Sequence, residues 1–178
     1  ANFSIVPPRF CFVGRLAISK GILEFISASK MINQNHPKIE FLVAGNFEAG
    51  SEDYCSMEFY NSIKKLTHIK FIGYLEHKEV YEIYKNGDVF VLPSYSEGLP
   101  KAALEAASLS LPLILTDVPG CRECIENNGL LVQSQNSHSL KQAMEEFINN
   151  PQLINTMGKK SLDICIKKFS IEKITIYD

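Results

Sequence analysis

The sequence predicts an α/β protein in which about six parallel strands form a doubly wound, Rossmann-like sheet wrapped by helices. Short apolar runs alternate with helix-like patterns through most of the 178 residues, which is the order that successive βαβ units require. Three of the early runs end at a glycine, namely Gly14, Gly45 and Gly73, and glycine permits a tight exit from a strand. A chain of this length can bury the core of one ordinary domain.

In the first half of the chain, three strands are each followed by a helix. The expected strands cover residues 10–13, 39–44 and 69–72. The expected helices begin at about Lys20 and cover residues 52–66 and 77–84. Apolar residues recur about every 3.6 positions in the first helix, as in an amphipathic helix that packs on a sheet. We expect Asn86-Gly87 to cap the third helix, because glycine is favoured just after a helix end.

The second half continues the alternation. The expected strands cover residues 88–92, 113–116 and 130–132, and the expected helices cover residues 100–109, a turn near 121–126, and segments beginning at Ser137 and Pro151. A serine side chain can accept a hydrogen bond from a free helical N–H group, so Ser137 is expected to cap its helix. Pro151 is expected to open the last helix, which runs to about Phe169, because proline is tolerated in the first turn.

Composition excludes several classes of function. The formal net charge is −2 and the lysines form no basic stripe, so the sequence offers no electrostatic footprint for nucleic acid. No apolar stretch approaches the roughly 20 residues that span a bilayer, and residues 1–4 do not begin a signal peptide. Five widely spread cysteines, two of them in a C-x-x-C at Cys121 and Cys124, are expected to be free thiols of a cytosolic protein.

The loop after the first strand places two cations beside a helix start. It reads Gly14-Arg15-Leu16-Ala17-Ile18-Ser19-Lys20-Gly21, which matches neither the dinucleotide fingerprint nor the P-loop. An arginine can fork onto phosphate oxygens while a lysine acts as a point charge, so Arg15 and Lys20 are candidate phosphate ligands. The alternative is that both are solvated side chains at a helix start, which is the usual place of such cations.

Two carboxylates, Glu97 and Glu105, flank a Gly-Leu-Pro step after the apolar run 88–92. Glu97 therefore belongs to the loop beyond a strand's carboxyl end, where ligands bind in open α/β sheets. The helix start between the glutamates offers free N–H groups to an anion. Alternatively, Glu97 only favours the positive end of the helix and Glu105 is a solvated helix residue. However, Glu105 lies among small apolar residues, where a buried charge needs a polar partner.

Taken in order, these segments resemble the C-terminal, donor-binding domain of GT-B glycosyltransferases, specifically the retaining glycosyltransferase family 4. The segment 14–21 is similar to the family's G-R-L-x-x-x-K-G loop, and Glu97 and Glu105 have the spacing of its E-x7-E signature. The strand 111–116 with Gly120 and Glu123, and then the strand 129–132, continue the pattern in register. The resemblance covers nearly all of residues 10–170.

The resemblance implies a role for each matching residue. Arg15 and Lys20 would hold the donor's diphosphate, Glu105 the ribose hydroxyls, and Glu97 the transferred sugar near the reacting carbon. The base would lie around residues 73–75. Glu97, Arg15 and Lys20 are thus the implied catalytic residues. The implied donor-binding set is Gly14, Arg15, Lys20, Tyr74, Leu75, Glu97, Gly98, Leu99, Pro100, Lys101 and Glu105.

The resemblance also implies what the whole protein does. It would move a hexose or N-acetylhexosamine, with retention, from a UDP-sugar to a lipid-linked bacterial oligosaccharide of capsule, O-antigen or exopolysaccharide. No bound metal or other cofactor would be needed. Residues 1–9 would be a linker remnant and residues 10–178 one nucleotide-sugar-binding domain that turns over little without the N-terminal acceptor domain. The protein would be cytoplasmic, with peripheral association at the inner membrane face.

Two other functions fit the sequence. One is a nucleotide-sugar epimerase of the same GT-B architecture, which would form product without an acceptor. The other is a non-catalytic α/β ligand-binding module, in which Glu97 and Glu105 would face solvent and no nucleotide would bind.

Overall fold

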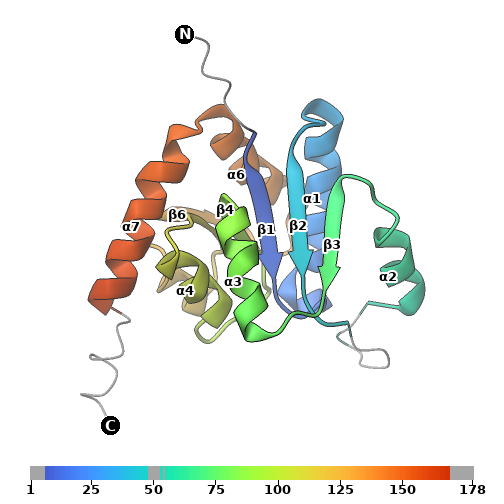
Figure 1. Cartoon of the computed structure of the whole chain (residues 1–178), viewed down its shortest axis with the longest axis horizontal. Coiled ribbons are helices and arrows are strands. Elements are labelled where there is room, and N and C mark those ends of the chain that lie inside the picture. Colours follow the sequence, from blue (N-terminus) through green and yellow to red (C-terminus); the bar gives the residue numbers. More distant parts are fainter. Residues whose placement is uncertain (1–6, 48–52, 54, 169–178) are drawn as a thin grey trace.

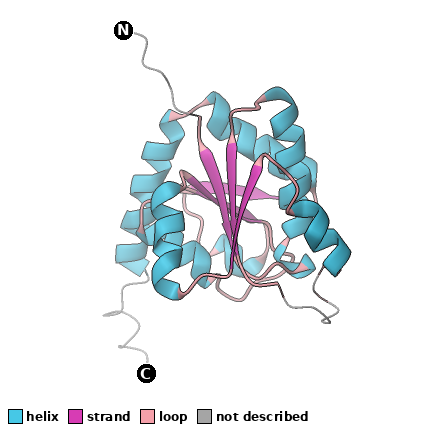
Figure 2. Ribbon diagram, turned by 45° about the vertical axis from the view of Figure 1, so that its right-hand side comes forward, coloured by secondary structure: helices cyan, strands magenta, loops and turns pink. Residues whose placement is uncertain are grey.

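The computed structural model describes residues 7–47, 53 and 55–168 and shows one sheet of six parallel strands (Figures 1 and 2). The strands lie in the order β3-β2-β1-β4-β5-β6. Their bounds are β1 Arg9–Val13, β2 Glu40–Ala44, β3 Ile69–Gly73, β4 Val89–Leu92, β5 Leu113–Thr116 and β6 Gly129–Val132. The order reverses between β1 and β4, so the predicted doubly wound, Rossmann-like α/β fold is confirmed.

Helices cover both faces of the sheet. Their bounds are α1 Ile22–Asn35, α2 Met57–Ile63, α3 His77–Asn86, α4 Lys101–Ser108, α5 Pro119–Arg122, α6 Ser137–Asn149 and α7 Gln152–Lys168, with a 3-10 turn at Ile18–Lys20. Because βαβ crossovers are right-handed, the reversal between β3 and β4 moves α3 and α4 to the face opposite α1 and α2. Helix α6 packs on α1 and helix α7 on α4.

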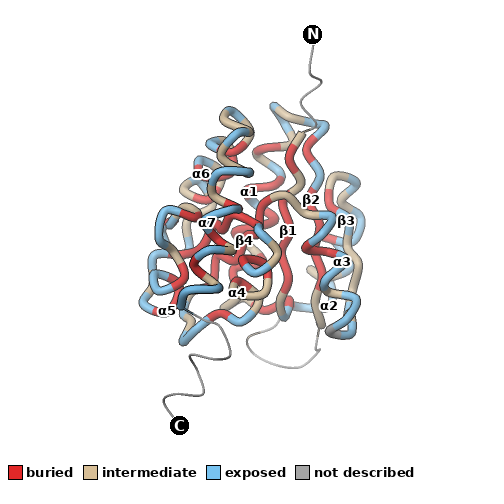
Figure 3. Tube along the Cα trace, turned by 60° about the vertical axis from the view of Figure 1, so that its left-hand side comes forward, coloured by how far each residue is buried: buried red, intermediate tan, exposed pale blue. Residues whose placement is uncertain are grey.

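The core lies along the central strands. Every residue of β4 and β5 is buried, as expected for parallel strands with helices on both faces. Phe12 of β1 packs against Phe25 of α1 with ring centroids 5.6 Å apart. Figure 3 shows this buried centre enclosed by helices whose outer surfaces are exposed. The edge strand β6 is only partly buried.

Two predicted helix starts are wrong, and local capping explains both. The helix expected over residues 52–66 begins at Met57, because the Ser56 side chain accepts the Phe59 N–H at 3.1 Å. The expected start at residue 52 lies outside the described residues. The helix expected to be capped by Ser137 is capped by Asn136, whose side chain accepts the Ser139 N–H at 2.9 Å.

Two further corrections concern short segments. The helical turn expected near residues 121–126 covers Pro119–Arg122 instead, because Pro119 pre-sets the first helical position. Gly87 is the C-cap of α3, as predicted, but its φ of −87° is extended rather than left-handed. A Cβ on Gly87 would lie 2.7 Å from Cys11 Sγ, so space and not backbone conformation requires glycine there. Phe169, the expected end of the last helix, lies outside the described residues.

The cysteines are free, as predicted. Burial is the main cause that raises the pKa of Cys121 to about 11 and that of Cys124 to about 12, so both thiols stay protonated near neutral pH. Within the ranges that the structure describes, no helix is long and apolar enough to cross a membrane.

Candidate functional site

Most of the predicted site residues gather at the edge of the sheet where β1 to β4 end, while Gly98 and Glu105 line neither hollow there. Two adjoining hollows lie there and share Val13, Gly14 and Arg15. The larger, of about 510 Å³, extends over Lys20 and the loop after β4, and the smaller, of about 200 Å³, over the loops after β2 and β3. We call the two together the carboxyl-end cleft. Its lining includes Gly14, Arg15, Lys20, Tyr74, Leu75, Glu97, Leu99, Pro100 and Lys101.

Lys20 and Glu97 meet inside this cleft. Lys20 Nζ lies 2.5 Å from Glu97 Oε1, and the side chains are only 23% and 10% exposed. The hydroxyl of the fully buried Ser94 donates to the same oxygen at 2.7 Å. The Ser94 carbonyl in turn accepts a hydrogen bond from the buried hydroxyl of Thr116 on β5. Glu97 is therefore held in the cleft by a cation and by a buried hydroxyl.

Arg15 is exposed at the junction of the two hollows. The loop that carries Arg15 and Lys20 is fastened from the β2–α2 connection by Asp53, which accepts the Ser19 N–H at 2.9 Å and the Ser19 hydroxyl at 2.6 Å. These hydrogen bonds, with the positive charges of Arg15 and Lys20, hold the pKa of Asp53 below its ordinary value. Asp53 thus stays ionised at neutral pH beside the two cations.

Glu105 has a different environment from Glu97 and does not line the cleft. It accepts a hydrogen bond from the Tyr84 hydroxyl of α3 at 3.2 Å, and Tyr84 is only 1% exposed. Burial first, and then the charge of Glu105, raise the pKa of Tyr84 well above its ordinary value, so the phenol remains a donor. The polar partner that a half-buried Glu105 needs is therefore Tyr84.

Successive loops at the cleft pack backbone against backbone. Gly21 has a φ of 74°, and a Cβ there would lie 2.1 Å from the Pro93 carbonyl oxygen. A Cβ on Gly45 would lie 1.7 Å from the Gly14 carbonyl oxygen. At Gly120 it would lie 1.9 Å from the Gly98 carbonyl oxygen. These contacts between loops therefore leave no room for side chains at the three glycines.

We expect Gly120→Ala to lower the free energy of unfolding by about 1–3 kcal/mol, because the new methyl group would overlap the Glu97 and Gly98 carbonyl oxygens. Gly98→Ala is the matched control, since a Cβ at Gly98 meets nothing within 4 Å and should change stability by less than about 0.5 kcal/mol. Urea unfolding of both variants measures the difference. Equal stability of the two would show that Gly120 is not tightly packed against the loop.

Several residues of the site were not foreseen from the sequence. Asp53, Ser94 and Thr116 fasten the cleft loops, and Tyr95 and Glu24 form a further contact between them. Each pairing except that of Ser94 with Glu97 joins segments far apart in the sequence. The uncharged run before Glu97 contains Ser94, whose three-residue separation from Glu97 is the single local signal that could have indicated a contact.

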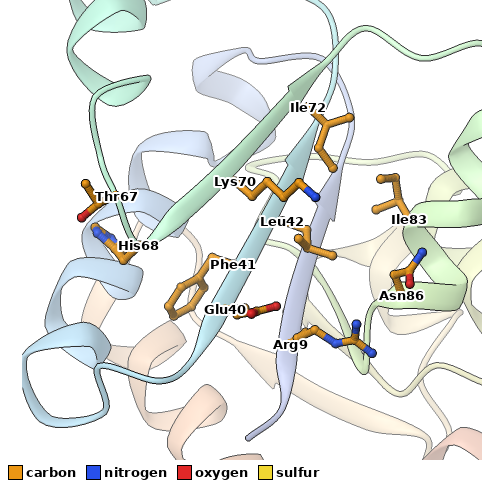
Figure 4. A pocket seen from close by; sticks show the side chains of 10 residues that line it. All are labelled: Arg9, Glu40, Phe41, Leu42, Thr67, His68, Lys70, Ile72, Ile83 and Asn86. Carbon is orange, nitrogen blue, oxygen red and sulfur yellow. The ribbon is translucent and has the colours of Figure 1, made fainter.

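A second groove, of about 410 Å³, lies at the opposite, amino-terminal edge of the sheet (Figure 4). Its charged side chains include Arg9, Glu40 and Lys70. Arg9 is already paired with Asp88 at 3.2 Å, and both Glu40 and Lys70 are exposed. The carboxyl-end cleft, where a partly buried ion pair and Arg15 converge, is therefore the better candidate. Among the described residues, no group of three or more His, Cys, Asp or Glu side chains is placed to hold a metal ion.

The fold and the cleft define a Rossmann-like α/β domain with a candidate ligand site at the carboxyl ends of its strands. The sequence matches the family described as Glycosyl transferases group 1 over residues 5–163. The chain belongs to this family, and the resemblance predicted from the sequence is confirmed.

Relatives of known name agree with this assignment. An uncharacterized glycosyltransferase of Methanocaldococcus jannaschii is 34% identical over 91% of the chain and 44% of its own length. The Escherichia coli UDP-Gal:alpha-D-GlcNAc-diphosphoundecaprenol alpha-1,3-galactosyltransferase is 30% identical over 92% of the chain and 42% of its own length. Anabaena HepE, solved with UDP and glucose, has the same fold (TM-score 0.84, 21% identity, 97% of this chain and 47% of its own). The chain thus spans less than half the length of these proteins.

Proposed function

We propose that the carboxyl-end cleft binds a UDP-sugar and that the protein transfers its hexose or N-acetylhexosamine, with retention, to a lipid-linked oligosaccharide. The observation that carries this proposal is the convergence of Arg15, Lys20 and Glu97 on one cleft at the carboxyl edge of the sheet. Two cations can neutralise a departing diphosphate, and stabilising charge that develops in the transition state is the main source of such catalysis.

The Lys20–Glu97 pair can remain in place while both residues contact the donor. An ammonium group has three N–H donors, and one of them is used on Glu97, so others are available to phosphate oxygens. Glu97 accepts both Lys20 and Ser94 on Oε1, which leaves Oε2 for a sugar hydroxyl. In this arrangement Lys20 holds the leaving diphosphate and also fixes the carboxylate that orients the sugar.

The smaller hollow suits the nucleoside. It is mainly apolar in character, and Tyr74 and Leu75 stand at its wall. Tyr74 is 71% exposed, so its ring is available to a flat base. The base would lie here, the diphosphate at Arg15 and Lys20, and the ribose between them toward Glu105. Glu105 does not line the cleft itself but follows Ala102 of its lining by about one turn of α4.

The relatives are more than twice as long as their matched segments, and we infer that the acceptor is bound by a domain corresponding to their unmatched part. Residues 1–9 would then be linker except for Arg9, which already belongs to β1, and residues 10–178 would be the donor domain. The E. coli relative acts on a diphosphoundecaprenol substrate by name, which supports a lipid-linked acceptor. We extend the proposal to a place at the inner face of the cytoplasmic membrane.

Calorimetry of the chain with UDP, GDP and ADP tests the proposal. We expect saturable binding of UDP, tighter than that of the other two nucleotides. The Arg15→Ala variant should weaken UDP binding by about tenfold or more, since a hydrogen bond to a charged group contributes roughly 1.5–3 kcal/mol. A folded chain that binds none of the nucleotides would contradict the proposal and favour a non-catalytic module.

We expect Glu105→Ala to weaken UDP binding by about tenfold, because a carboxylate that accepts ribose hydroxyls would be lost. The deficit should disappear with 2′,3′-dideoxyuridine diphosphate, which lacks those hydroxyls. Tyr84→Phe is the control for stability, since it breaks the same Tyr84–Glu105 hydrogen bond and keeps the carboxylate. Equal UDP affinity of Glu105→Ala and the unmodified chain would remove Glu105 from the donor site.

A further inference from the structure

We infer that Glu24 and Tyr95 are positioning residues that hold the loop of Lys20 and the loop of Glu97 in register. Neither residue lines the carboxyl-end cleft, so both act through the groups they fasten. The inference rests on the proposed function where it concerns donor affinity, and on the fold alone where it concerns the loops.

Tyr95 connects the two loops at two points. Its backbone N–H donates to the Ser19 carbonyl at 2.8 Å, next to Lys20 in the sequence. Its hydroxyl donates to Glu24 Oε1 at 2.9 Å, in the first turn of α1. Tyr95, in the Glu97 loop, therefore contacts both the end of the Lys20 loop and helix α1, which follows that loop.

The Glu24 carboxylate is buried at an energetic cost. The residue is 9% exposed, and among the residues that the structure describes its Oε2 has no hydrogen-bond partner. An unpaired buried carboxylate oxygen is unfavourable, and the positive end of α1 offsets this cost only in part. Apolar residues at positions 24 and 95 would pack without that cost, but no hydrogen bond would then fix how the loop of residue 95 lies on α1. The hydrogen bond does so, and it thereby sets where the backbone of residue 95 meets Ser19.

Tyr95 remains a donor over the physiological range. Burial first, and then the hydrogen bond to Glu24, raise the pKa of Tyr95 to about 12. The phenol therefore stays protonated and donates to Glu24 Oε1.

The Tyr95 contacts affect the spacing of the Lys20–Glu97 pair. Its two charged groups come from different loops and approach to 2.5 Å, so a shift of either loop by an ångström would separate them. Along the chain, Tyr95 is two residues from Glu97, and its backbone partner Ser19 is next to Lys20. We expect the Tyr95 contacts to hold the cation and the carboxylate at the spacing that a sugar diphosphate requires.

Three variants test the inference: Tyr95→Phe, Glu24→Leu and the conservative Glu24→Gln, whose amide oxygen can still accept from Tyr95. UDP affinity should fall about fivefold in the first two and stay within about twofold in the third. The Tyr95→Phe/Glu24→Leu double variant should lose no more than either single variant, because both remove the same contact. A purely structural pair would lower thermal stability and leave UDP affinity unchanged.

Amide hydrogen exchange gives a readout that needs no ligand. The amide of residue 95 should exchange faster in Tyr95→Phe and Glu24→Leu but not in Glu24→Gln, while that of Phe90 in β4 stays protected. Unchanged exchange at residue 95 in the first two variants overturns the inference, whether or not UDP binds. UDP binding by the unmodified chain with equal affinity in all variants overturns it too. If the unmodified chain binds no UDP, the proposed function fails, and exchange alone decides the inference.

Discussion

Gly21→Ala should be the most destabilising substitution at the cleft, lowering the free energy of unfolding by about 2–4 kcal/mol. Two effects add: a side chain at a φ of 74° is strained, which costs about 1 kcal/mol, and the new Cβ would lie 2.1 Å from the Pro93 carbonyl oxygen. The backbone of one loop must move to relieve that overlap, and overpacking of this kind costs about 1–3 kcal/mol.

Gly73→Ala separates the two effects. Gly73 also has a positive φ, of 84°, but a Cβ there meets nothing within 4 Å. We expect Gly73→Ala to lower the free energy of unfolding by only about 1 kcal/mol, which is the cost of the backbone conformation alone. Urea unfolding followed by circular dichroism measures both variants, with m-values as a check on two-state behaviour. Equal losses at Gly21 and Gly73 would show that the Lys20 and Glu97 loops are not in tight contact.

Lys20→Met should have the largest effect on donor binding, weakening UDP-sugar affinity by about 30-fold or more. It removes the cation nearest the proposed diphosphate and also leaves Glu97, only 10% exposed, without its cationic partner and with only the Ser94 hydroxyl on Oε1. A carboxylate without its cation then repels the phosphates that the lysine attracted. Calorimetric titration with UDP and with a UDP-sugar measures the loss.

Lys85→Met is the matched control. Lys85 pairs with Glu82 at 2.8 Å on the surface of α3, and both side chains are at least 60% exposed, so its loss should leave UDP affinity unchanged. Circular dichroism confirms that each variant is folded. Similar affinity of the two variants would mean that Lys20 only stabilises the loop and does not contact the donor.

The strands could be predicted because each is a short apolar run, and parallel strands buried on both faces need such runs. The order of helices and strands then followed, and with it the edge at which Arg15, Lys20 and Glu97 had to meet. The errors lie at helix starts, where a single capping side chain decides which residue begins the helix. Asn136 takes the cap in place of Ser137, and Ser56 starts α2 later than the apolar pattern indicates.

The contacts that shape the cleft could not be predicted in this way. Tyr95 and Glu24 are 71 residues apart, and Ser19 and Asp53 are 34 apart. Pairings over such distances depend on how adjacent loops pack, and no local periodicity encodes them. The same holds for Glu105, whose Tyr84 partner comes from the preceding helix. The sequence therefore indicated the chemistry of the site but not the contacts that fasten it.

A crystal of the chain soaked with UDP would locate the donor site. We expect density for UDP in the carboxyl-end cleft, with the diphosphate against Arg15 and Lys20, the ribose within hydrogen-bond reach of Glu105, and the uracil beside Tyr74. Nucleotide bound in the groove at the amino-terminal edge of the sheet, or an empty cleft at saturating UDP, would contradict this expectation.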